Sequence, residues 1–259
     1  MKRILITGAT GHLGFHLCNE FLNRGYDVYA LCRKQSKIPK FKKKIKIIYG
    51  DVTDFNSFLD ASRGKNYIVH AAAVYSHDEK IRQKIKITSV KGSINLSKIA
   101  KLKSIKKIIY VSSVSVLGLR LNKKPISKIR LISKSNDPYV QAKLLSHKII
   151  KKNREKFKLP ISMVLPSTII GENDLKITPS NKIIKNILNY PLGIYVEGGI
   201  NIVYVKDISN AIANLLIKKT IKDFILSGYN ISIKNLVEKV LKISNKKKIK
   251  IFFPKFFIK

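Results

Sequence analysis

The amino-acid sequence predicts an α/β fold in which helices cover both faces of a parallel β-sheet, and three observations support this. Short, largely aliphatic runs alternate with longer amphipathic segments, which is the rhythm of βαβ units. The aliphatic runs are nearly continuous, as in strands that are buried on both faces. The first run leads directly into a glycine-rich stretch, and a helical pattern follows it.

The expected elements alternate regularly along the first part of the chain. Strands are expected at residues 3–7, 27–32, 45–49, 67–70, 107–112 and 161–165, and helices at residues 12–23, 56–62, 81–102 and 139–157. Because crossovers between parallel strands are right-handed, this order produces a doubly wound sheet. We therefore expect one α/β domain over residues 1–165.

The rhythm changes after Pro166. Helices are expected at residues 181–189, 208–218 and 233–243, and strands at residues 201–205, 224–226 and 248–253. We interpret residues 166–259 as a smaller, partly interleaved region that completes the fold and forms a substrate pocket.

The net charge of +37 is the most unusual property of the composition. A polyanionic partner, such as nucleic acid or an anionic membrane surface, would explain it. Codon bias would explain it as well, because the lysines are scattered and form only short runs, at Lys42 to Lys44 and Lys246 to Lys248. Aromatic residues do not interleave with them as on a base-stacking platform. We favour the compositional explanation and keep nucleic-acid binding as an alternative.

The sequence shows no sign of export, membrane insertion or structural metal. The apolar stretch at the N-terminus is too short for a signal peptide, and no apolar run is long enough to span a bilayer. Cys18 and Cys32, the two cysteines, have no metal-ligating neighbours at the usual spacing. We therefore expect a cytoplasmic protein without a disulfide framework, a zinc site or a membrane span.

The glycine-rich stretch TGATGHLG, residues 7–14, predicts a phosphate-binding turn. Gly8 permits the sharp strand-to-helix turn, Gly11 lets the backbone approach a pyrophosphate, and Gly14 lets helix and sheet pack closely. The N-terminus of the helix offers free amides to the anion. The other candidate contacts in this turn are Thr10, His12 and Leu13. Its position at the first strand indicates a Rossmann-type NAD(P)-binding domain.

The second strand distinguishes the two nicotinamide cofactors. It ends at Cys32-Arg33-Lys34 without a carboxylate. A carboxylate there would bind the ribose hydroxyls of NAD, whereas an arginine suits the 2′-phosphate of NADP. Arg33, together with Lys34, is therefore expected to bind that phosphate. NADP is the expected cofactor, and NAD is the alternative.

Two further strand ends complete the expected nucleotide site. Asp51 follows the third strand and is placed to accept a hydrogen bond from an adenine amino group, with the backbone of Val52 beside it. Small residues follow the fourth strand and leave room for the cofactor; they are Ala71, Ala72 and Ala73.

Tyr139 and Lys143 lie one turn apart on a helix that Asp137 is expected to cap and Pro138 to open. An ammonium group beside a phenol lowers the phenol pKa from about 10, so Tyr139 is expected to act as general acid/base at a carbonyl or alcohol. Lys143 is also expected to hold the nicotinamide ribose. Ser112 and Ser113 follow the fifth strand at the edge where ligands bind, and a hydroxyl there would orient the substrate carbonyl.

These motifs resemble those of the extended short-chain dehydrogenases/reductases, in the group of dihydroflavonol 4-reductases and hopanoid-associated sugar epimerases. The resemblance covers nearly the whole chain. It rests on TGATGHLG at 7–14, GDVTD at 50–54, HAAA at 70–73, YVSSVSVLG at 110–118, YVQAK at 139–143, LPSTIIGENDLKITPS at 165–180 and NIVYVKDISNAI at 201–212. It implies that Ser113 orients the carbonyl, that Tyr139 is the acid/base and that Lys143 is its partner. It also implies that the nicotinamide end is lined by Pro166, Ser167 and Thr168.

Two features depart from the family pattern. Ser89 stands where the family usually carries an asparagine that supports a water relay, so the resemblance implies altered proton transfer. The chain ends at residues 256–259, where relatives usually continue, so we expect a small C-terminal substrate region that is truncated relative to the family.

The combined reading is an NADP-preferring oxidoreductase that acts on a carbonyl or secondary alcohol of a small-molecule substrate. Two alternatives stay open. An NAD-dependent nucleotide-sugar epimerase or dehydratase uses the same residues, and a non-catalytic NADP-binding scaffold or RNA-binding protein would explain Ser89 and the charge. The resemblance also implies a homodimer that pairs through the helices at 81–102 and 139–157.

Overall fold

The computed structural model describes residues 2–41, 44–118, 126 and 129–254. Lys42 and Lys43 of the first lysine run and the chain end at 256–259 lie outside these ranges. None of the helices within them combines the length and the apolar character that crossing a bilayer requires.

A seven-stranded parallel sheet forms the centre of the described chain. Its strands are β1 (Arg3–Thr7), β2 (Asp27–Cys32), β3 (Lys46–Tyr49), β4 (Tyr67–His70), β5 (Lys107–Val111), β6 (Ile161–Pro166) and β10 (Asp223–Leu226). They lie in the order β10-β6-β5-β4-β1-β2-β3. The predicted doubly wound sheet is confirmed. From β1 the chain adds strands toward one edge of the sheet and from β4 toward the other, and such folds bind ligands at this switch point between β1 and β4.

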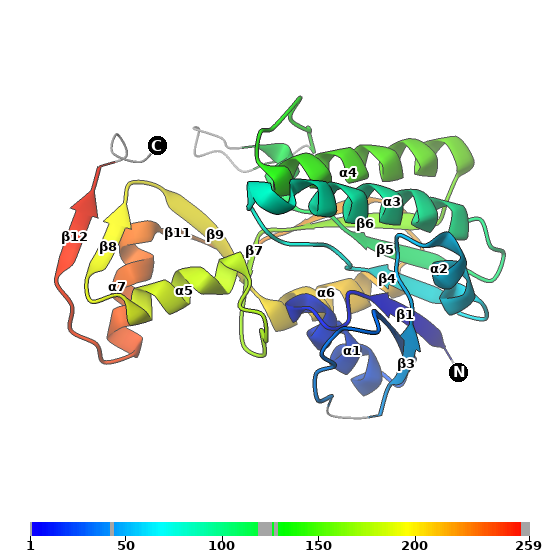
Figure 1. The fold of residues 1–259 in the computed structure, drawn as a ribbon, viewed down its shortest axis with the longest axis horizontal. Helices are drawn as coiled ribbons and strands as arrows, with labels where there is room; N and C mark the ends of the chain where they lie inside the picture. The colour runs from blue at the N-terminus through cyan, green and yellow to red at the C-terminus, as the bar shows by residue number, and fades with distance from the viewer. Residues whose placement is uncertain (1, 42–43, 119–125, 127–128, 255–259) are drawn as a thin grey trace.

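Helices cover both faces of this sheet (Figure 1). One face carries α1 (His12–Asn23) and α6 (Val205–Ile217), and the other carries α2 (Phe55–Ser62), α3 (Arg82–Ile99) and α4 (Pro138–Phe157). Both faces of the sheet are apolar and need a cover, as strand β1 illustrates. Its side chains alternate between two cores: Ile4 and Ile6 join the core under α1 and α6, and Leu5 joins the core under the other helices.

The helix ends follow local capping chemistry. The Asp137 carboxylate accepts a 2.8 Å hydrogen bond from the Val140 amide and Pro138 begins α4, as the sequence predicts. The helix expected at 81–102 is shorter. A 3-10 helix, η1 (Glu79–Ile81), precedes α3, and α3 ends at Ile99. A second 3-10 helix, η2 (Val114–Leu117), follows β5.

The chain after Pro166 contributes to two parts of the molecule. Helix α6 and strand β10 return to the central sheet, and the other elements form a smaller lobe (Figure 1). The lobe contains β7 (Thr168–Ile170), α5 (Pro179–Asn189), β8 (Gly193–Val196), β9 (Gly199–Tyr204), β11 (Tyr229–Ser232), α7 (Ile233–Ile243) and β12 (Lys250–Phe253). Its core is a separate apolar cluster that includes Ile187, Leu236, Val237 and Leu241.

Candidate active site

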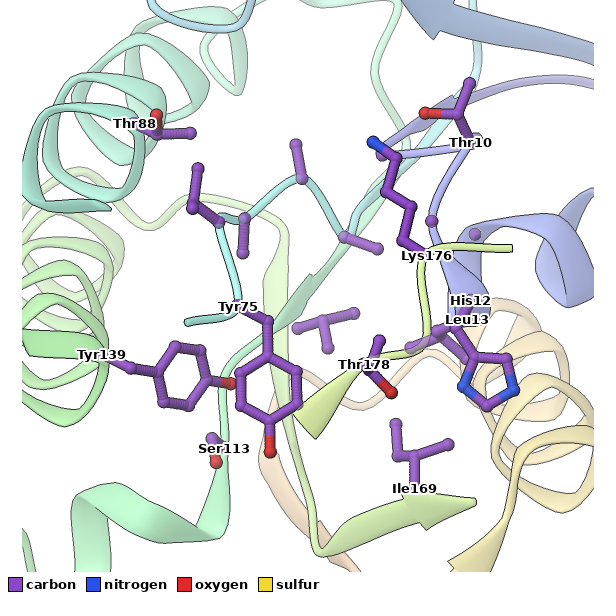
Figure 2. A pocket seen from close by; sticks show the side chains of 18 of the residues that line it. Thr10, His12, Leu13, Tyr75, Thr88, Ser113, Tyr139, Ile169, Lys176 and Thr178 are labelled. Carbon is purple, nitrogen blue, oxygen red and sulfur yellow. The ribbon is translucent and has the colours of Figure 1, made fainter. Parts of the chain in front are cut away.

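A cleft of about 470 Å³ opens at the carboxyl ends of the central strands. Its walls come from the β1–α1 turn, the ends of β2, β4, β5 and β6, the first turns of α4, and the segment between β7 and α5. The volume is that of a small-molecule site, and the position is where doubly wound sheets bind their ligands. Figure 2 shows side chains from these elements converging on one space.

Apart from Lys34, which was expected to assist Arg33, every site residue that the sequence predicted lines this cleft. They are Gly8, Thr10, Gly11, His12, Leu13, Gly14, Arg33, Asp51, Val52, Ala71, Ala72, Ala73, Ser113, Tyr139, Lys143, Pro166, Ser167 and Thr168. The fold thus brings together residues from distant parts of the sequence. Ser89 is buried in α3 and does not line the cleft, whereas its neighbour Thr88 does.

The glycine turn needs its glycines for steric reasons. Gly8 adopts φ of 72°, and a Cβ there would lie 2.8 Å from the Ala71 backbone. A Cβ on Gly14 would lie 2.0 Å from the Gly8 carbonyl oxygen. Gly11 is the N-cap of α1 and supplies no side-chain cap, so the first amides of the helix stay available to a ligand. The turn is therefore shaped for close backbone approach to an anion.

The walls near β2 and β3 carry the two groups expected at the adenosine end. Arg33 lines the cleft directly after β2. Asp51 lies close to β3, and its Oδ1 atom accepts 2.8 Å hydrogen bonds from the amide and the hydroxyl of Thr53. These bonds hold the carboxylate in place at the edge of the cleft.

The opposite end of the cleft contains Ser113, Tyr139 and Lys143. Lys143 is 5% exposed, and its Nζ atom lies 5.9 Å from the centre of the Tyr139 ring. Ser113 caps η2 by accepting a 3.2 Å hydrogen bond from the Ser115 amide. Ser113 lies beside the hydroxyl end of Tyr139 (Figure 2), and the two side chains form a hydrogen bond. The Ser113 and Tyr139 hydroxyls could therefore act on one ligand oxygen, with the Lys143 ammonium group near the Tyr139 ring.

Burial decides the protonation of these groups, and it corrects one expectation. It lowers the pKa of Lys143 to about 8. It also raises the pKa of Tyr139 above its ordinary value, and the neighbouring Tyr75 raises it further, although a hydrogen bond with Ser113 opposes the shift. The predicted lowering of the Tyr139 pKa by Lys143 is therefore wrong for this structure, because desolvation disfavours the phenolate and outweighs the hydrogen bond with Ser113.

Sequence reasoning missed two aromatic residues in this part of the cleft, Tyr75 and His77. The Tyr75 ring lies 4.6 Å from the Tyr139 ring between centroids, and its hydroxyl lies 3.1 Å from the Ser180 hydroxyl at the start of α5. The His77 ring bonds the Asp137 carboxylate at 2.5 Å. Both residues follow β4 in an irregular segment without a motif, so only their tertiary position reveals them.

The segment between β7 and α5 is the second omission. Asp174, Lys176, Ile177 and Thr178 all line the cleft. These residues belong to the motif at 165–180 that supports the family resemblance, but the sequence alone assigned none of them a role.

Comparison with known proteins agrees with this geometry. Residues 4–225 match the model of the NAD dependent epimerase/dehydratase family. The chain belongs to this family. Its fold is also that of the crystal structure of gox2253, with a TM-score of 0.88 and 28% identity over all of this chain and 79% of that one.

Named relatives of this family member include reductases. The "Putative dihydroflavonol 4-reductase" of Synechocystis is 28% identical over 213 residues, which are 79% of this chain and 60% of that protein. Anthocyanidin reductase of Arabidopsis thaliana is 26% identical over 268 residues, covering 92% of this chain and 79% of that protein. The chain spans 60% and 62% of the length of the first two curated relatives that it matches.

Proposed function

We propose that this family member is an NADP-preferring oxidoreductase that interconverts a carbonyl and a secondary alcohol. One observation carries the proposal. A glycine turn shaped for a pyrophosphate lies in the same cleft as a serine and a tyrosine that hydrogen-bond each other and a lysine one helical turn from the tyrosine.

The residues present fit a dinucleotide. The glycine turn would bind the pyrophosphate, Arg33 the 2′-phosphate, and Asp51 the adenine amino group. At the nicotinamide end, the Ser167 hydroxyl is buried at the cleft wall and has no hydrogen-bond partner among the described residues. A buried hydroxyl without a partner is costly, and a polar ligand edge would satisfy it. When bound, the nicotinamide ring supplies or accepts the hydride.

The protein side of the reaction is proton transfer. In the reducing direction the Tyr139 hydroxyl donates its proton to the carbonyl oxygen as that oxygen gains the electron pair of the C=O bond. The Ser113 hydroxyl donates a hydrogen bond to the same oxygen and orients it. The ammonium group of Lys143, which lies 5.9 Å from the centre of the Tyr139 ring, would supply positive charge near the phenolate that remains.

A fluorescence titration with NADPH and NADH tests the proposal before any substrate is known. We expect the unmodified protein to bind NADPH more tightly, Arg33→Ala to remove the preference, and Tyr139→Phe to bind both nucleotides normally. A screen of ketones and aldehydes should then show turnover that Tyr139→Phe lowers about 100-fold or more. Failure of the unmodified protein to bind either nucleotide would overturn the proposal.

The family description supports one second candidate, a nucleotide-sugar epimerase, which uses a hydride that returns to its own substrate. Such an enzyme keeps its cofactor through turnover. Release of NAD from the purified, heat-denatured protein in near-stoichiometric amount would favour this candidate over a reductase that exchanges its nucleotide.

We also propose that the protein is a cytoplasmic homodimer. The free thiols of Cys18 and Cys32 are buried in the core, which suits a reducing compartment. Helices α3 and α4 pack side by side at the outer face of the sheet, where a second copy could extend the layer (Figure 1). Light scattering that gives the mass of one chain would contradict the dimer.

A further inference from the structure

Residues 172–180, here called the bridging segment, link the glycine-turn side of the cleft to the small lobe. The segment follows β7 and runs into α5, and its residues 174 and 176–180 line the cleft. Figure 2 shows Lys176 extending from it toward Thr10 of the glycine turn. The proposed function gives this lysine no role.

Two histidines of α1 hold the start of the bridging segment. The Nε2 atoms of His12 and His16 lie 3.1 Å and 3.0 Å from the carbonyl oxygen of Glu172. Since a carbonyl oxygen only accepts, both rings carry their hydrogen on Nε2 and donate it. Helix α1 begins at the glycine turn, so these bonds fix the bridging segment relative to the turn.

A polar cluster orders the rest of the segment. The Oδ2 atom of Asp174 accepts hydrogen bonds from the amide and hydroxyl of Thr178, both 2.7 Å, and from the Asn181 side chain at 2.9 Å. Asn181 also pairs with the backbone of Gly171, accepting at 3.1 Å and donating at 3.0 Å. These contacts occupy the Oδ2 atom of Asp174, and none of them involves Lys176.

The backbone beside Lys176 is strained. Ile177 adopts φ of 48°, which a β-branched side chain rarely does. Its amide donates a 3.1 Å hydrogen bond to the carbonyl oxygen of Asp174, which stabilises the turn. Strain of this kind persists where the surroundings enforce it, and it is concentrated at ligand-binding sites.

Lys176 is left as a cation without a partner. Among the described residues, its ammonium group has neither a hydrogen-bond acceptor nor a carboxylate within ion-pair distance. The carboxylates that line the cleft, Asp51 and Asp174, each accept hydrogen bonds from other groups, and neither forms an ion pair with Lys176. An anionic ligand at the glycine turn would therefore meet a free positive charge on the opposite side.

We propose that Lys176 binds the pyrophosphate of the dinucleotide, so that the bridging segment and the glycine turn hold it from two sides. This inference rests on the proposed function, because it takes the dinucleotide as the ligand. The Lys176 ammonium donates hydrogen bonds to non-bridging phosphate oxygens, and the α1 amides bind the others. The contact is independent of the 2′-phosphate, so it serves NADH and NADPH alike.

Fluorescence titrations with NADH and NADPH, at low and at moderate salt, test the assignment. Lys176→Ala should weaken both nucleotides by the same factor, about fivefold or more, and make binding less dependent on salt. Lys182→Ala removes an equal charge from α5 outside the cleft and should change either affinity less than twofold. Lys176→Arg should retain most of the affinity.

The possible outcomes separate the two proposals. If the unmodified protein binds nucleotide and Lys176→Ala leaves both affinities unchanged, the Lys176 assignment is wrong and the proposed function stands. A loss confined to NADPH would move the contact to the 2′-phosphate and overturn the assignment. Binding of neither nucleotide by the unmodified protein would overturn both proposals.

Discussion

Lys143 donates a 2.9 Å hydrogen bond from Nζ to the carbonyl oxygen of Val111, the last residue of β5. The bond ties the helix that carries Tyr139 to the strand that precedes Ser113. It also holds a buried ammonium group at the cleft, where burial lowers its pKa to about 8. The same side chain is thus needed for the proposed chemistry and costly for folding.

Replacing Lys143 by methionine should stabilise the protein at pH 7. A buried group whose folded pKa is about 8, against about 10.4 when unfolded, opposes folding wherever it is protonated. Loss of the Val111 hydrogen bond offsets part of the gain, so we expect Lys143→Met to raise the free energy of unfolding by about 2 kcal/mol.

The difference in the free energy of unfolding between Lys143→Met and the unmodified protein should decrease as the pH rises. Because the folded pKa is depressed, the unmodified protein gains stability as the pH rises from about 8 to about 10.4, and the advantage of Lys143→Met shrinks over that window. Urea denaturation of both proteins at pH 7 and pH 10 measures this stability difference. Lys148→Met, an exposed substitution on the same helix, should show no such trend, and equal behaviour of both variants would contradict the assignment.

Removing the Tyr75 hydroxyl should shift the pH profile of alcohol oxidation. The oxidising direction needs the Tyr139 phenolate, so its rate rises with pH through the Tyr139 pKa. Tyr75 is one cause of the raised pKa of Tyr139. We expect Tyr75→Phe to move the midpoint of the rate profile to lower pH. Ser180→Ala breaks the bond to Tyr75 but keeps the phenol, and an equal shift in this control would refute the electrostatic explanation.

A methyl group at Gly14 should abolish nucleotide binding. Its Cβ would lie 2.0 Å from the Gly8 carbonyl oxygen, so Gly14→Ala must displace the turn backbone. Gly25→Ala is the matched control, because Gly25 has φ of 76° but nothing within 4 Å of its Cβ position. The control should cost about 1 kcal/mol of stability and bind nucleotide normally. Titration and thermal denaturation of both variants check this, and normal binding by Gly14→Ala would be the contrary result.

The ion pair between Arg154 and Asp223 should be important for stability. It joins α4 to β10 through two parallel hydrogen bonds, and the side chains are 14% and 13% exposed. Breaking a largely buried pair leaves one charge without a partner, so Asp223→Ala should lower the free energy of unfolding by about 2–4 kcal/mol. The double substitution Arg154→Met with Asp223→Leu should recover much of the loss in a denaturation experiment. Additive losses would show that the pair itself contributes little.

The sequence by itself determined the fold class and most of the cleft. Continuous apolar runs specify strands buried on both faces, and the glycine turn and the Tyr139–Lys143 pair carry their geometry in local spacing. Helices α1 and α7 have the predicted bounds because their apolar periodicity runs to both ends. Each of these features depends on residues close together in the chain.

The tertiary structure decided what depends on distant partners. Strands β7, β8 and β11 were not predicted, because they are short and exist through pairing with β9 or β12. The raised pKa of Tyr139 also comes from its surroundings, because desolvation depends on everything packed around the phenol. Tyr75 and Lys176 lie in irregular segments without periodicity, so only the folded chain places them at the cleft.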